Sequence, residues 1–129
     1  MTKPPETLGQ FEQQVLTAVM ATREDAYALQ IYNKVCEYAG RQVNAGSTYV
    51  TLERLEKKGY IKCESRTGSA DGEGRKRKFY WMTPEGLEVL HLAMETASRL
   101  SASFFESWRL GKWGIRRIVK ATKPSGYDS

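Results

Sequence analysis

The chain has 129 residues, of which 40% are hydrophobic and 27% are charged, so it has the length and composition of one soluble globular domain. No apolar run approaches the roughly 20 residues that a membrane-spanning helix requires, and the N-terminus lacks the features of a secretory signal. We therefore expect a cytoplasmic protein. A structural zinc site takes four Cys or His ligands, and the sequence has too few, namely Cys36, Cys63 and His91. Nothing else in the sequence indicates a metal, a cofactor or an enzyme.

The positive charge is concentrated in the middle of the chain. The whole sequence has a net charge of +5 and a pI near 9.3. Residues 41–80 carry ten Lys and Arg side chains against five Asp and Glu, whereas residues 1–40 are acidic with a net charge of −2. This separation indicates one surface that faces nucleic acid, although a modest basic excess is also common on solvated surfaces.

Three amphipathic helices are predicted in the first 60 residues. Apolar residues recur at helical spacing over about 7–22 and again over 28–39, where Asp25 is the predicted N-cap and Gly40 the predicted end. A third helix is predicted over about 44–58. Because only a few residues join the second and third helices, the three together indicate a helix-turn-helix.

The sequence then changes from helical to strand periodicity. Residues 60–66 alternate apolar and polar side chains, and residues 78–82 are rich in aromatic strand formers. The Gly-rich segment 67–74 predicts a flexible loop between two strands. A hairpin directly after a third helix is the wing of a winged helix. The expected fold is therefore mainly α (α+β), a winged helix-turn-helix with a two-stranded wing and a long C-terminal helix.

This C-terminal helix is predicted to begin after the hairpin, with Thr83 as N-cap and Pro84 at the first position. Apolar residues then fall at alternating steps of three and four, as in the seam of a coiled coil. A helix over 84–108 is too long for a small globule to cover. We expect its seam to pack against a second copy of the chain, with packing on the chain's own first helix as the alternative. The predicted dimer interface is Leu87, Leu90, Met94, Ala97, Ser101, Phe104 and Trp108.

The third helix and the hairpin carry the predicted DNA-binding surface. Tyr49, Leu52 and Leu55 are expected to face the core, and the opposite stripe is polar and then cationic, which suits the major groove. Arg54 is the best candidate for a bidentate contact with guanine. For this helix, a solvated face is the alternative. Phosphates would neutralise the four consecutive cations 75–78 of the hairpin, for which an edge strand protected by charge against aggregation is the alternative. The predicted DNA-binding residues are Ser47, Thr48, Tyr49, Thr51, Arg54, Lys58, Arg75, Lys76, Arg77 and Lys78.

The same segments resemble the PadR family of bacterial winged-helix transcriptional regulators. Residues 46–61, GSTYVTLERLEKKGYI, look like the family's recognition helix and its entry to the wing. Residues 74–86, GRKRKFYWMTPEG, look like the wing exit and the start of the next helix, and the resemblance extends over about 8–108. The sequence departs from the family pattern in three places. Many members have Gly, Pro and Pro where this chain has Ala28, Val50 and Lys76.

The resemblance implies a homodimeric repressor that binds a pseudo-palindromic operator and is released by an effector or a signal. Residues 106–108 are similar to a stretch in multidrug-sensing members whose tryptophan stacks on flat aromatic ligands. Phe104 and Trp108 are therefore candidate effector-binding residues, with plain interface packing as the alternative. The expected partners are double-stranded DNA, a second copy and a small aromatic effector. The rival function is a winged-helix protein-interaction module without sequence-specific DNA binding.

The expected organisation has three parts. Residues 6–83 form a winged-helix DNA-binding domain and residues 84–108 a dimerisation helix, followed by a basic C-terminal extension over 109–129. For the extension, a short basic helix, an additional DNA arm and a loosely held tail stay open.

Overall fold

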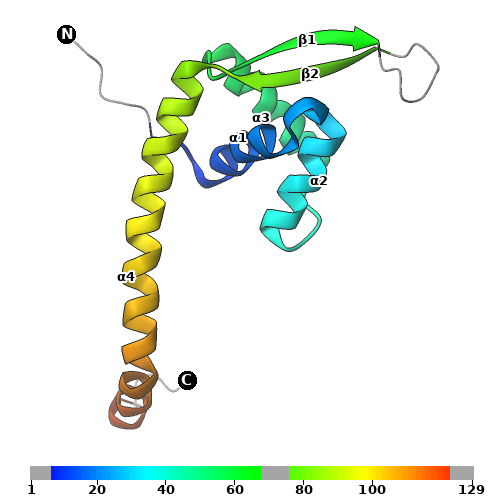
Figure 1. Cartoon of the computed structure of the whole chain (residues 1–129). Coiled ribbons are helices and arrows are strands. Elements are labelled where there is room, and N and C mark those ends of the chain that lie inside the picture. Colours follow the sequence, from blue (N-terminus) through cyan, green and yellow to red (C-terminus); the bar gives the residue numbers. More distant parts are fainter. Residues whose placement is uncertain (1–6, 68–75, 123–129) are drawn as a thin grey trace. The chain divides into compact units, whose positions relative to one another are not determined.

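The computed structural model describes the backbone of residues 7–67 and 76–122, and side chains as far as Gly111. Contacts divide the chain into two units, residues 1–94 and 95–129. The three-part organisation expected from the sequence stays a prediction. The elements form the predicted winged helix-turn-helix (Figure 1). They are α1 (Gln10–Thr22), the 3-10 turn η1 (Arg23–Asp25), α2 (Ala28–Ala39), α3 (Ala45–Lys57), β1 (Ile61–Thr67), β2 (Lys76–Met82) and α4 (Pro84–Thr122).

The first three helices pack around one apolar core. Each helix repeats its apolar residues every three or four positions, so that one stripe faces the common centre. Leu16 of α1, Ile31 of α2 and Leu52 of α3 are fully buried there. Burial of one such side chain stabilises the folded state by about 1.5–3 kcal/mol, so this core holds α3 firmly against α1 and α2.

The C-terminal end of α2 and both ends of α3 lie close to the predicted positions. Gly40 ends α2 in the left-handed conformation with φ 72°, and Gly59 follows α3 with φ 83°. The side chain of Asn44 caps α3, because its Oδ1 accepts a hydrogen bond of 3.0 Å from the Ser47 N–H. This cap fixes where α3 begins and therefore which of its side chains lie in the first turn.

The prediction that Asp25 caps α2 is wrong. Asp25 belongs to η1, and α2 begins after Tyr27, which has an extended backbone. Tyr27 forms an antiparallel bridge with Phe79, and the Tyr80 N–H donates to the Ala26 carbonyl at 2.9 Å. The chain thus enters α2 as a short extended segment beside β2, where the Ala26 carbonyl has a backbone partner.

The predicted hairpin is confirmed. β1 and β2 pair antiparallel from Ile61 opposite Met82 to Thr67 opposite Lys76, and β2 begins two residues earlier than predicted. The loop 68–75 lies outside the described residues. The hairpin packs on α3 through Ile61, which is buried in the same core as Leu55. The Cys63 thiol also donates to Glu56 Oε2 at 3.4 Å.

Partial burial raises the pKa values of two side chains on this face of the hairpin. Burial and the hydrogen bond with Glu56 raise the pKa of the Cys63 thiol. Burial also raises the pKa of Tyr80, on the same face of the hairpin, to about 12. In both groups burial favours the neutral form over the charged form.

Helix α4 starts as predicted and ends later than predicted. Thr83 caps it, since its Oγ1 accepts from the Gly86 N–H at 3.0 Å and donates to the Gly59 carbonyl at 2.6 Å. The helix continues to Thr122 instead of ending near residue 108, because no proline interrupts the sequence between Pro84 and Pro124. In the part of the chain that the structure describes, no helix is long and apolar enough to cross a membrane.

Candidate nucleic-acid interface

Helix α3 presents a different face from the predicted one. Thr48 is 0% exposed and Thr51 is 4% exposed, and both lie on the core side with Leu52 and Leu55. Tyr49, which was predicted to face the core, is 48% exposed. The predicted orientation is wrong because a threonine methyl packs in a core as a valine does, and these four buried residues share one helix face.

The exposed face of α3 is apolar at its centre and cationic towards its end. Val50, Arg54 and Lys57 are all exposed. Lys57 is absent from the predicted set, although it follows Arg54 by three residues, a spacing that places both on one side of a helix. Glu53 and Glu56 are exposed on the same helix, so α3 itself supplies little net positive charge.

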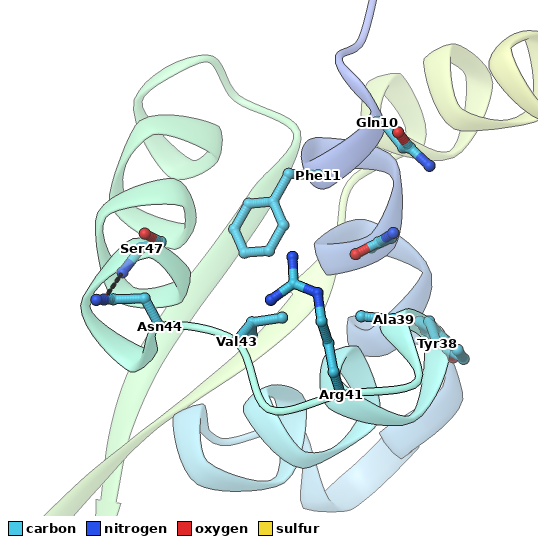
Figure 2. Close-up of a pocket in the computed structure, with 9 residues that line it drawn as sticks. Gln10, Phe11, Tyr38, Ala39, Arg41, Val43, Asn44 and Ser47 are labelled. Atoms are coloured by element: carbon cyan, nitrogen blue, oxygen red, sulfur yellow. Dashed lines mark hydrogen bonds between the residues drawn. The ribbon is translucent and has the colours of Figure 1, made fainter. Parts of the chain in front are cut away.

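A groove of about 620 Å³ opens beside the N-terminus of α3 (Figure 2). Phe11 of α1, Val43 of the α2–α3 turn and the exposed Ser47 of α3 line it together with Arg41. Among the described residues that line this groove, Arg41 has the one charged side chain. Arg41 and Ser47 thus line one groove. Sequence reasoning missed Arg41 because one arginine in a turn has no periodic signal.

Lys58, a predicted DNA contact, forms an ion pair within the protein. Its Nζ lies 3.1 Å from Glu12 Oε2, and both side chains are largely buried. The pair joins the end of α3 to α1, far apart in the sequence. A DNA contact by Lys58 stays a prediction, whereas its role in holding α3 is visible in the structure.

The cations of the wing point to both sides of β2. Lys76 and Lys78 are exposed, and Arg77 between them is half-buried on the opposite face. The Arg77 guanidinium carbon lies 4.4 Å from the centre of the Tyr27 ring. Arg75 falls outside the described residues.

Arg77 belongs to a cluster of cations and aromatic rings in the half of the hairpin next to the loop. The Tyr27 and Phe79 rings meet edge to face at 5.5 Å, and Arg66 lies 5.0 Å from the centre of the Phe79 ring. Arg66 also pairs with Glu64 at 2.6 Å. Arg66 and Arg77 are directly opposite in the hairpin, where like charges repel, and each guanidinium has its own ring as a partner. The cluster therefore holds two guanidinium groups in defined positions.

The predicted seam of α4 divides into a buried and an exposed part. Leu90 packs with Val89 in the chain's own core, so the prediction that it faces a second copy is wrong. Phe104 and Trp108 are about half exposed, and their rings stack at 6.0 Å with 21° between the planes. The remaining predicted interface residues are Leu87, Met94 and Ser101, which are exposed, and Ala97, which is half-buried.

Comparison with known proteins agrees with this architecture. The family model described as the transcriptional regulator PadR-like family matches residues 15–92. The chain belongs to this family. The PadR resemblance of the sequence is thereby confirmed, and membership of a family of transcriptional regulators supports a DNA-binding role. Such regulators are generally not enzymes.

Solved PadR-like structures share the fold. A regulator from Bacillus cereus strain ATCC 14579 is 26% identical with a TM-score of 0.62, covering 74% of this chain and 87% of that one. A family member from Eggerthella lenta DSM 2243 is also 26% identical, with a TM-score of 0.56 over 71% of this chain and 78% of that one. A third, from Clostridium difficile R20291, shows the fold alone at 22% identity, with a TM-score of 0.61 and coverages of 76% and 97%. No curated protein matches the chain.

Proposed function

We propose that this PadR-like chain is a repressor that binds a pseudo-palindromic operator as a homodimer and is released by an effector or a signal. The observation that carries the proposal is the exposed face of α3, combined with the cations that β2 carries next to the loop of the wing. Lys76 and Lys78 are exposed there, and Arg77 lies against the Tyr27 ring. A recognition helix of this kind reads base edges in the major groove, and wing cations contact the phosphate backbone.

The proposed roles follow the exposure of each side chain. Ser47, Tyr49, Arg54 and Lys57 contact bases or adjacent phosphates from α3. Thr48 and Thr51 support α3 from the core and are withdrawn from the set of DNA contacts. The proposed backbone contacts of the wing are Arg75, Lys76, Arg77 and Lys78.

The dimer is supported by the exposed aromatic rings of α4. Phe104, Phe105 and Trp108 expose large apolar surfaces within residues 95–111, and a second copy would remove them from water. A flat aromatic effector would stack on the parallel rings of Phe104 and Trp108, whereas plain packing between copies would use the same rings.

Duplex binding at several salt concentrations tests the proposal. We expect fluorescence anisotropy with the chain's own upstream DNA to show affinity that falls with salt. Binding releases condensed cations from the phosphates, and this release gains less free energy as the salt concentration rises. Lys78→Gln should reduce the slope of log affinity against log salt by about 0.9, the value for one phosphate contact. Lys34→Gln, which removes the same charge from α2, should leave the slope unchanged.

Sequence preference is tested on Arg54. Arg54→Ala should lower discrimination against a wrong base by about 1–3 kcal/mol while non-specific binding persists. A chain with no salt-sensitive duplex binding would contradict the proposal and favour the protein-interaction module instead.

A further inference from the structure

Val50 stands at the centre of the exposed face of α3. Its side chain is 54% exposed, and Gly46, Glu53 and Lys57 share its side of the helix at spacings of four, three and seven residues. The core-facing residues Thr51 and Leu52 follow it directly and point to the other side. Val50 is therefore the apolar residue that α3 directs straight away from the protein.

A valine at an exposed helix position contributes little to the stability of the fold. Its branched side chain loses rotamer freedom in a helix, so it is a weaker helix former than alanine. It also leaves more than half of its surface exposed at this position. Tyr49 beside it is similarly exposed, so the helix presents adjacent apolar surface in the middle of its outer face.

Gly46 leaves the methyl groups of Val50 accessible. Helical side chains lean towards the N-terminus, so Val50 leans over the position of Gly46, one turn earlier. Gly46 has no side chain that could cover it. A Cβ at this position would lie 3.0 Å from Asn44 Oδ1, which caps the helix, so the cap also favours glycine here.

We propose that Val50 contacts the 5-methyl group of a thymine in the major groove and thereby selects thymine at one operator position. The inference rests on the proposed function and deepens it. Thymine presents a methyl group on its major-groove edge, and apolar side chains recognise it by contact. Arg54 and Lys57 follow Val50 by one and two turns, so their cations would hold this part of α3 against the duplex.

Removal of single methyl groups from protein and DNA tests the contact. Duplexes are first selected from a random library with the 129-residue wild-type chain. Each thymine of the selected half-site is then replaced by deoxyuridine, which lacks only the 5-methyl group. At one position the wild type should bind about fourfold more weakly, the factor for one methylene-sized group that is not removed from water. Val50→Ala should bind both duplexes equally at that position.

Two features keep the experiment decisive. Val50→Ala should fold normally, because alanine is the stronger helix former at an exposed position. Leu29→Ala, which truncates a similarly exposed apolar residue on α2, should retain the wild-type preference for thymine over deoxyuridine.

The outcomes separate this inference from the proposed function. If the wild type enriches no duplex, the proposed function fails and the inference fails with it. If duplexes are enriched but every deoxyuridine is tolerated, the Val50 contact alone is overturned. The contact is also overturned if Val50→Ala keeps the fourfold preference at the sensitive position.

Discussion

The guanidinium carbon of Arg77 lies 4.4 Å from the centre of the Tyr27 ring. Tyr27 directly precedes α2 and Arg77 lies in β2, so the contact joins a cation of the wing to the helix-turn-helix. The Tyr27 hydroxyl also accepts a hydrogen bond of 3.1 Å from Gln30 Nε2, and the ring meets Phe79 edge to face. The half of the hairpin next to the loop is consequently attached to the helix-turn-helix, and the position of Arg77 depends on Tyr27.

Replacement of Tyr27 by leucine should destabilise the protein. The change removes one cation–π contact and one aromatic pair, which together contribute about 1–2.5 kcal/mol to the free energy of unfolding. Urea unfolding followed by tryptophan fluorescence measures the difference. Tyr27→Phe keeps the ring and loses only the bond to Gln30, so it should cost less than about 1 kcal/mol. Equal losses in the two variants would show that the ring contacts contribute nothing.

Thr48→Val should stabilise the protein. Among the described residues, the buried Thr48 hydroxyl has no hydrogen-bond partner, so folding removes it from water without compensation. Valine has the same shape without this hydroxyl, and we expect a gain of about 1 kcal/mol in urea unfolding. Thr48→Ser keeps the hydroxyl and removes the methyl, and should lose about 0.8 kcal/mol.

The same variant checks which face of α3 meets DNA. A core position should tolerate Thr48→Val without loss of duplex affinity. A stable Thr48→Val protein with weakened duplex binding would return this side chain to the set of DNA contacts.

The elements could be predicted from the sequence, whereas the outward face of α3 could not. Apolar spacing, the stop at Gly40 and the cap at Thr83 are local signals, and the structure places the helices and the hairpin close to the predicted positions. Thr48 and Thr51 are ambiguous, because a threonine can turn its methyl to a core or its hydroxyl to water. Which side it takes depends on the helices packed around it, and α1 and α2 supply that information only in three dimensions.

Contacts between distant segments also had no sequence signal. Lys58 and Glu12 are 46 residues apart, and each looks like a solvated charge on its own helix. Arg77 looks like one of four equivalent wing cations until Tyr27 is placed beneath it. These pairs depend on the packed fold, so periodicity and motif spacing could not assign them.

Gly86→Ala should destabilise the protein although the residue lies in a helix. Alanine normally improves an exposed helix position by about 1 kcal/mol relative to glycine. Here a Cβ would clash with the backbone carbonyl of Tyr60, which is fixed because it accepts from the Thr83 N–H at 3.1 Å. Overpacking of this kind costs about 1–3 kcal/mol, measurable by urea unfolding.

Gly111→Ala is the matched control in the same helix. Among the described residues, none comes within 4 Å of a Cβ at Gly111, so alanine should be neutral or stabilising there. If Gly86→Ala left the free energy of unfolding unchanged, the backbone of Tyr60 could move away from α4 without loss of stability, and the prediction would be wrong.

Phe104→Asp should convert a dimer of this chain into monomers. Phe104 is about half exposed and stacks on Trp108, and a second copy that covered the two rings would have to bury the new carboxylate as well. Loss of a buried phenylalanine costs about 1.5–3 kcal/mol for each copy, and an unpaired buried charge adds to this. Sedimentation velocity measures the change in mass.

Ser103→Asp introduces the same charge at the adjacent exposed position on the other side of α4 and should remain dimeric. A monomeric wild type, or identical behaviour of the two variants, would contradict the proposed interface.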